Sequence, residues 1–350
     1  MEILLYLLSP LSFLYQFLFF LSQKLKRKYS LKPCFVISVG NLSVGGTGKT
    51  PMILFLIEYF LKQYPQKKIV VLSRGYKAKL SQKGALLPTD PDPTLYGDEP
   101  SLIKSKFPGI SVVIGINRYQ SFQKFIPFEI QNSKDCLVLL DDGFQHIQIQ
   151  RDLDIVLLDS NAPIGNGFTI PLGVLREPTS HLARADVIIF TKLNQKNRKK
   201  VENSKKKLIK WNQTFFSSQI SFQKFPKEPN RSYILVTGVG NPMHVLQTAK
   251  QALDSEDVIL KSYPDHYGFS EDDLNLILEE RLDKGKETLG VVTTEKDWIK
   301  ISKFPKFMES LKEKGWSFHV IQIGVQLEEE SKFFSILDHL VSTSEAKTDP

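Results

Sequence analysis

The sequence predicts an α/β fold with a mostly parallel sheet, helices on both of its faces, a smaller second α/β domain and an N-terminal membrane helix. Three observations lead to this prediction. Short, β-branched apolar runs alternate with longer mixed segments. A glycine-rich loop joins the first run to a helix-like segment. Residues 1–21 are almost wholly apolar.

The composition is that of a globular chain with two packed units. At 350 residues the chain exceeds the size at which one hydrophobic core usually stops growing. Its 41% hydrophobic and 24% charged residues exclude wholesale disorder and a multi-span membrane protein. Two cysteines, Cys34 and Cys136, cannot form a disulfide framework for this length, and no Cys/His cluster has zinc-like spacing. We therefore expect a reducing cytosol and no structural zinc.

Residues 1–28 predict a membrane-associating helix with a basic flank. No basic stretch precedes the apolar run and no small-residue cleavage site follows it, which argues against a secretory signal. A buried core helix would need protein cover on all sides. About 20 apolar residues can cross a bilayer, whereas Pro10 also suits a bent helix in the interface, so the sequence leaves both arrangements open. The basic flank consists of Lys24, Lys26, Arg27 and Lys28. Basic residues beside an apolar segment favour the cytoplasmic side of a membrane and anionic headgroups.

The chain has a formal net charge of +8, and residues 192–210 form a second cluster of basic residues after the N-terminal flank. Most such runs are solvated helix faces. A nucleic-acid partner would need aromatic stacking residues or a recognised module, and the sequence shows neither. We expect no nucleic-acid partner, and prefer an anionic membrane or substrate.

The apolar runs divide the chain into two predicted domains. Residues 33–195 are expected to form the nucleotide-binding domain, with strands at 35–39, 69–72, 112–114, 137–140, 155–158 and 187–190 and a helix at 51–61. Residues 230–341 are expected to form the smaller domain, with strands at 233–236, 258–260, 289–292 and 318–323. Residues 342–350 look like a loose polar tail.

The loop after the run 35–39 has the residues that hold nucleotide phosphates. Glycines let successive backbone N–H groups turn toward oxygens, and the helix that begins near Pro51 adds partial positive charge. Lys49 would reach the β- and γ-phosphates and Thr50 the magnesium ion. The strict pattern has glycine where Ser43 stands, so the match is one position short. The predicted fold is therefore P-loop NTPase-like, with a nucleotide site at Val44, Gly45, Gly46, Thr47, Gly48, Lys49 and Thr50.

A P-loop needs an acidic partner for its metal, and the run 137–140 ends in Asp141 and Asp142. The sequence does not say which of the two touches the metal. A GTPase would carry an Asn/Thr-Lys-x-Asp motif after a late strand. Here that place reads Thr191-Lys192-Leu193-Asn194, so a GTPase is disfavoured.

Further short motifs follow one another in a specific order: Ser73-Arg74-Gly75-Tyr76, Gly97-Asp98-Glu99-Pro100, Asp141-Asp142-Gly143-Phe144-Gln145-His146, Leu175-Arg176-Glu177-Pro178, Asp265-His266-Tyr267 and Thr293-Thr294-Glu295-Lys296-Asp297. Together with the P-loop, this order resembles the tetraacyldisaccharide 4'-kinase family, from the N-terminal helix to about Asp297. The resemblance implies an ATP- and Mg²⁺-dependent kinase of lipid A biosynthesis, attached to the cytoplasmic face of the bacterial inner membrane.

The resemblance also implies roles for individual residues. Lys49 would be catalytic beside ATP, with Thr50, Asp141, Asp142 and Glu177 near the metal. Asp98 would be the general base toward the sugar hydroxyl, and His266 its partner from the other domain. By turn statistics alone, Asp98 in a Gly-Asp-Glu-Pro loop reads as a turn residue. Further active-site candidates are Glu99, Gln145, His146 and Arg176.

The function expected from these observations is transfer of the γ-phosphoryl group of ATP to the 4'-hydroxyl of a tetraacylated disaccharide 1-phosphate. The expected partners are this acylated disaccharide phosphate lipid and the inner-membrane surface, with no obligate protein partner. Two alternatives stay open: a membrane-recruited P-loop NTPase switch with a protein partner, and a basic nucleic-acid-binding ATPase.

Overall fold

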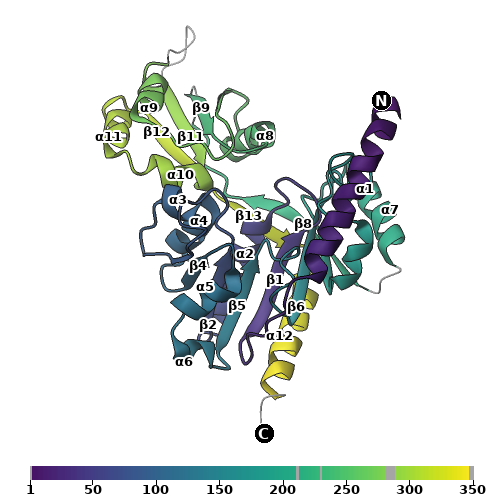
Figure 1. Ribbon diagram of the computed structural model, residues 1–350. Coiled ribbons are helices and arrows are strands. Elements are labelled where there is room, and N and C mark those ends of the chain that lie inside the picture. The colour runs from purple at the N-terminus through teal and green to yellow at the C-terminus, as the bar shows by residue number, and fades with distance from the viewer. Residues whose placement is uncertain (1, 210–212, 229–230, 281–287, 347–350) are drawn as a thin grey trace.

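A nine-stranded, mostly parallel sheet organises the larger of two α/β units (Figure 1). The computed structural model describes residues 2–209, 213–228, 231–280 and 288–346. Among the described strands of this sheet, only β3 and β13 run antiparallel to their neighbours. The strand order is β13 (Ile323–Leu327), β8 (Thr214–Phe222), β7 (Val187–Thr191), β6 (Leu153–Asp159), β1 (Phe35–Asn41), β5 (Cys136–Asp141), β2 (Lys68–Ser73), β4 (Ser111–Ile114) and β3 (Ala85–Leu86).

The six strands predicted for this unit are confirmed. β8 was not predicted, because its sequence follows a basic segment and mixes serine and glutamine with phenylalanine. Cys34 and Cys136 are buried free thiols, as expected from the apolar runs around them.

Helices cover both faces of the sheet, as predicted. One face packs against α2 (Lys49–Gln63), α4 (Asp98–Lys106) and α12 (Glu330–Ala346). The other face packs against α5 (Arg118–Phe125), α7 (Arg198–Leu208) and the 3₁₀ helix η1 (Thr179–Arg184). The short helices α3 (Pro93–Tyr96) and α6 (Phe128–Gln131) lie in connections.

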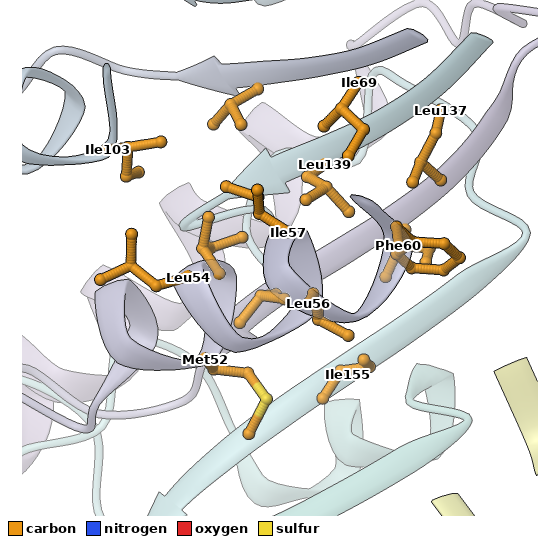
Figure 2. Packing of buried hydrophobic residues seen from close by; sticks show 14 of the residues in the cluster. Met52, Leu54, Leu56, Ile57, Phe60, Ile69, Ile103, Leu137, Leu139 and Ile155 are labelled. Atoms are coloured by element: carbon orange, nitrogen blue, oxygen red, sulfur yellow. The ribbon is translucent and has the colours of Figure 1, made fainter. Parts of the chain in front are cut away.

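The helix α2 is held in place by the apolar stripe that its sequence repeats every three or four residues. Met52, Leu56 and Phe60 are completely buried. Figure 2 shows α2 side chains lying close to Leu137 and Leu139 of β5. Full burial of one such side chain stabilises the fold by about 1.5–3 kcal/mol. This packing fixes the start of α2, and with it the P-loop, against the sheet.

The smaller unit has a four-stranded parallel sheet in the order β10 (Val258–Ser262), β9 (Arg231–Thr237), β11 (Thr288–Thr294) and β12 (Ser317–Ile321). The helix α8 (Pro242–Leu253) packs on one face. The other face packs against α9 (Glu271–Leu278), α10 (Glu295–Ile301) and α11 (Pro305–Glu313). The four predicted strands of this unit are present, although the last one ends at Ile321.

The chain then returns to the larger unit, which the sequence did not predict. β13 pairs with β8, and α12 packs against α2, where Phe334 stacks on Tyr59 with 4.0 Å between the ring centroids. The predicted boundaries at 195 and 341 therefore do not follow the sheets. The predicted loose tail 342–350 begins inside α12, and residues 347–350 lie outside the described residues.

The N-terminal segment forms one continuous helix, α1 (Glu2–Lys24), with Pro10 inside it. Within the described residues, no helix is long and apolar enough to cross a membrane. The prediction of a membrane helix therefore gains no support from a spanning segment.

The polarity of α1 is the reverse of that of a surface helix in a water-soluble domain. Polar residues in its middle face the protein: the Ser12 hydroxyl donates to Thr169 O at 2.9 Å, and the Tyr15 hydroxyl donates to Arg176 O at 2.8 Å. Its large apolar residues face outward, and we call this exposed set the apolar ridge: Leu11, Phe13, Leu14, Phe17, Leu18, Phe20 and Leu21. In Figure 1, α1 lies along the edge of the larger unit, away from the smaller unit.

Candidate active site

The P-loop connects the end of β1 to the start of α2. Gly45 and Gly48 have φ angles of +107° and +88°, which side-chain-bearing residues rarely adopt. Gly48 precedes α2 without any side-chain cap, so N–H groups of the first helical turn remain available to a ligand. The Thr191 hydroxyl donates to Thr47 O at 2.9 Å, which anchors the loop to the end of β7. The loop is thus a preformed anion site.

Lys49 opens α2 and points toward the end of β5. Its Nζ lies 3.4 Å from Asp142 Oδ1 and 3.4 Å from Asn41 Oδ1. Thr50, the next residue, is half-buried. The structure therefore brings Lys49 together with one of the two predicted aspartates.

Asp141 and Asp142 differ sharply in their surroundings. Asp141 is buried and accepts a hydrogen bond from the Ser73 hydroxyl at 2.8 Å. Burial, followed by the charge of Asp142, raises the pKa of Asp141 to about 6. Burial would also raise the pKa of Asp142, but Lys49 and Arg176 outweigh it and hold that pKa at about 2. Asp142 is therefore the firmly ionised member of the pair.

Arg176 and Gln145 extend the site from Asp142 to Glu177. Arg176 Nη1 donates to Asp142 Oδ2 at 2.9 Å and to Gln145 Oε1 at 3.3 Å. Gln145 Nε2 donates to Glu177 Oε1 at 2.8 Å. These predicted residues therefore form one hydrogen-bonded chain.

Glu177 lies at the buried end of that chain. Its side chain is 0% exposed, and its Oε2 is paired with His181 at 2.7 Å and Arg184 at 2.8 Å. Its oxygens are engaged by these partners and by Gln145, and its place among the metal ligands stays a prediction. His181 and Arg184 were not foreseen, although both lie in the 3₁₀ helix η1 that begins two residues after Glu177.

The residues predicted to hold a magnesium ion beside the P-loop offer oxygen donors. Mg²⁺ in phosphotransferases is typically held by one or two protein oxygens together with substrate phosphates. The Thr50 hydroxyl and the Asp141 and Asp142 carboxylates are donors of this kind. Among the described residues, no group of three or more His, Cys, Asp or Glu side chains is arranged to hold a metal ion by itself.

His146 is a neutral histidine behind this site. Burial, then Arg118 and Arg151, lowers its pKa to about 3. Its Nε2 is buried and has no hydrogen-bond partner among the described residues. The structure does not join its ring to the aspartates by a hydrogen bond.

The second centre lies where the two units meet. Asp98 is the first residue of α4, after Gly97 with φ +90°. Its Oδ2 lies 2.9 Å from His266 Nδ1 and 3.2 Å from Lys300 Nζ, both in the smaller unit. His266 has a φ of +65°, so its backbone adopts an uncommon conformation at this contact. The predicted pairing across domains is present in the structure.

Two lysines of α10 keep Asp98 charged. Burial would raise the pKa of Asp98, but the hydrogen bond from His266 and the charges of Lys300 and Lys296 lower it below its usual value. Lys296 Nζ also lies 3.5 Å from Glu99 Oε1. The sequence placed Lys296 in a motif without a role, and it did not single out Lys300. Their spacing of four residues puts both on one face of α10.

The two centres share one edge of the large sheet. Ser73, at the end of β2, binds Asp141, and the nearby Tyr76 ring contacts the His266 ring edge-on at 5.6 Å between centroids. Ligands of open α/β sheets bind at the carboxyl ends of the strands. Nucleotide phosphates at Lys49 and an acceptor near Asp98 would therefore meet at this edge.

Comparison with known proteins supports a kinase. The family model described as Tetraacyldisaccharide-1-P 4'-kinase matches residues 4–342. A tetraacyldisaccharide 4'-kinase of Leptospira biflexa serovar Patoc is 44% identical over 98% of this chain and 97% of its own length. One of Halothermothrix orenii is 31% identical over 86% of this chain and 84% of its own length.

A solved structure is similar over nearly the whole chain. It is the "apo" form of LpxK from Aquifex aeolicus in complex with ATP, with a TM-score of 0.67 and 27% identity. The similarity covers 97% of this chain and 99% of that one.

Proposed function

This chain belongs to the tetraacyldisaccharide-1-P 4'-kinase family and is an ATP-dependent lipid A 4'-kinase, and from that premise we propose which of its residues carry out the transfer. The γ-phosphoryl group of ATP moves to the 4'-hydroxyl of a tetraacylated disaccharide 1-phosphate. The observation that carries the proposal is the shared sheet edge, with Lys49 beside Asp142 and Asp98 beside His266.

The phosphate half of the reaction rests on the P-loop. Its free N–H groups and Lys49 bind the phosphates and neutralise charge as the bond from the γ-phosphorus to the bridging oxygen of ADP breaks. The Asp142 carboxylate orients the Lys49 ammonium, and Arg176 holds that carboxylate in place. Phosphoryl transfer needs little more than this positioning and charge compensation.

The acceptor half rests on Asp98. The 4'-hydroxyl oxygen forms its bond to phosphorus while its proton passes to the Asp98 carboxylate. His266 orients that carboxylate through Nδ1, and Lys300 and Lys296 keep it ionised, so that the base is ready at neutral pH.

Magnesium is proposed to bind beside the P-loop. The Thr50 hydroxyl with Asp141 or Asp142 would hold it. When bound, Mg²⁺ neutralises the phosphate charge that develops during transfer. Binding would also favour the ionised form of Asp141, whose pKa is raised in the ligand-free chain.

Membrane attachment is proposed through α1. A helix that turns its hydroxyl and amide groups to the protein and its phenylalanines outward suits the boundary between headgroups and acyl chains. Lys24, Lys26, Arg27 and Lys28 would face anionic headgroups on the cytoplasmic side of the inner membrane. The enzyme would then work at the surface that contains its acylated substrate.

The deciding experiment follows the γ-phosphate of ATP. Labelled MgATP is incubated with a lipid A disaccharide 1-phosphate in detergent micelles, and the intact chain is compared with Lys49→Ala. We expect labelled lipid from the intact chain and none from the variant. Lys32→Met is the matched control, because Lys32 is exposed and pairs with Asp152 near the start of β1, whereas the P-loop follows the end of that strand.

ATP hydrolysis without labelled lipid would overturn the proposal. It would favour the membrane-recruited NTPase switch, which should also respond to a protein partner.

A further inference from the structure

Arg151 binds two backbone carbonyls of the turn that follows Asp142. Residues 143–146 link Asp142 to Gln145 and His146, and the turn closes with His146 N donating to Gly143 O at 2.8 Å. Arg151 Nη2 donates to Gly143 O at 2.9 Å and to His146 O at 2.7 Å. A single nitrogen therefore binds the carbonyls at both ends of the turn.

Arg151 is itself fixed. Its side chain is 10% exposed, and Nη1 is paired with the Asp154 carboxylate. Asp154 is buried at the start of β6, and its backbone N–H donates to Asp186 Oδ2 at 2.8 Å beside β7. The guanidinium thus ties the turn to two strands of the sheet through a rigid fork.

Asp142 needs such support. Its φ is +49°, an uncommon conformation for a non-glycine residue. Residues held in sparsely populated backbone regions persist only where their surroundings restrain them. The restraint here comes from Gly143 N, which donates to Val39 O at 3.0 Å, from Arg118 Nη1, which donates to Asp142 O at 3.2 Å, and from Arg151, which donates to the next carbonyl, Gly143 O.

We propose that Arg151 is a positioning residue for the phosphoryl transfer, acting by clamping the carbonyls of Gly143 and His146 so that Asp142 and Gln145 stay aligned with Lys49 and Arg176. This inference rests on the proposed function. Lysine cannot replace arginine here, because one ammonium lacks the planar fork that reaches Asp154 and both carbonyls together.

The geometry also provides a route for chemical rescue. Arg151 lines a cavity of about 450 Å³ that also touches Lys32, Arg184 and Asp186. This cavity is bordered by the residues that lead into β1, β6 and β7, not by the P-loop. A small guanidinium ion could enter it and replace the missing group when Arg151 is shortened.

The test compares Arg151→Lys and Arg151→Ala with the intact chain in the labelled-lipid assay. We expect the lysine variant to lose roughly 10- to 100-fold in kcat with KM for ATP unchanged, as for other groups that orient active-site residues. Methylguanidinium should restore turnover to Arg151→Ala and leave the intact chain unaffected. In both variants the His146 amide should exchange its hydrogen faster.

Lys32→Met is the control, because Lys32 lines the same cavity but binds Asp152 and not the turn. Unchanged kcat in Arg151→Lys would overturn the proposal. So would a loss of turnover that neither accelerates exchange at His146 nor responds to methylguanidinium. If Arg151→Ala does not fold, Arg151→Lys decides alone.

Failure of the proposed function looks different. The intact chain would then label no lipid, whereas the exchange measurement would still report whether Arg151 holds the turn.

Discussion

At the scale of single residues, Asp98 and Asp141 carry opposite pKa shifts although both carboxyl groups are buried. Burial raises both pKa values. The difference lies in the neighbouring groups. His266 and two lysines lower the pKa of Asp98, whereas the like charge of Asp142 is the largest influence on the pKa of Asp141 after burial and raises it further. The same residue type therefore has a lowered pKa in one place and a raised pKa in the other.

Replacing Asp98 by Asn should lower kcat by roughly 10²- to 10⁴-fold, because no carboxylate then accepts the hydroxyl proton. ATP affinity should hardly change, since the P-loop is intact. Turnover and nucleotide titration measure the two effects. Asp90→Asn is the matched control, because Asp90 also pairs with a lysine of the smaller unit, Lys303, yet is 88% exposed. Normal turnover in Asp98→Asn would remove Asp98 as the base.

Asp141 should make the ligand-free chain less stable at neutral pH. Its folded pKa of about 6 exceeds the usual 3.8, so its contribution to stability is present at low pH and is lost as the pH rises through 6. Asp141→Asn avoids this loss while keeping an acceptor for Ser73. The variant should gain up to about 3 kcal/mol over the parent between pH 4 and pH 8.

Urea unfolding at the two pH values, without nucleotide or metal, measures this difference. A gap that stays constant with pH would contradict the prediction.

At the scale of elements, charged side chains join α4 to α10, and α1 separates its polar residues from its apolar ones. Across α4 and α10, charged pairs join the two units: Lys106 to Glu295 at 2.7 Å and Lys300 to Asp98 at 3.2 Å. The contact therefore keeps the proposed base, Asp98, beside the lysines of α10. On α1, the polar face binds the protein and the apolar ridge is left outside.

Changing Phe13, Phe17 and Phe20 together to Ser should reduce binding to anionic phospholipid vesicles by at least about 100-fold, because each phenylalanine contributes about 1.5–3 kcal/mol when buried in an apolar phase. Co-sedimentation measures the binding, and the melting temperature should not fall, since these rings are 71%, 62% and 50% exposed. Leu276→Ser, on an exposed position of α9, is the control. Undiminished binding would refute the role of the ridge.

At the scale of the whole molecule, the chain leaves the larger unit, builds the smaller one and comes back. Tyr59 lies on α2 and Tyr64 directly follows it, and both hydroxyls donate to Asp338 of α12. The smaller unit is therefore an insertion between β8 and β13 and is connected through both strands.

The return of the chain makes the C-terminal helix part of the larger core. Phe333 is 0% exposed and packs edge-on against Phe216 of β8 at 5.3 Å between centroids. Phe333→Ala should lower the unfolding free energy by about 3–5 kcal/mol. Denaturant titration measures it, with Phe128→Ala, 75% exposed, as a control of similar chemistry. A loss below about 1 kcal/mol would show that α12 does not belong to this core.

The residues near the P-loop were predictable because they are local. Gly45 to Thr50 are neighbours in sequence, and their chemistry depends on a strand before them and a helix after them, both of which apolar periodicity reveals. The pair Asp98 and His266 was predicted only through the family resemblance, since 168 positions separate them and nothing local marks either one. Lys300 and Arg151 were not recognised, because a lysine or arginine acquires meaning only from the groups that folding brings to it.

The sequence alone therefore determined the class of fold, the nucleotide loop and ten strands, because each depends on short-range patterns of glycine, charge and apolar side chains. Tertiary structure decided where the chain divides, which carboxyl group is ionised, that Glu177 is taken up by His181 and Arg184, and that α1 turns its polar side inward. These features depend on contacts between distant segments and on burial, and neither can be read from the order of residues within one segment.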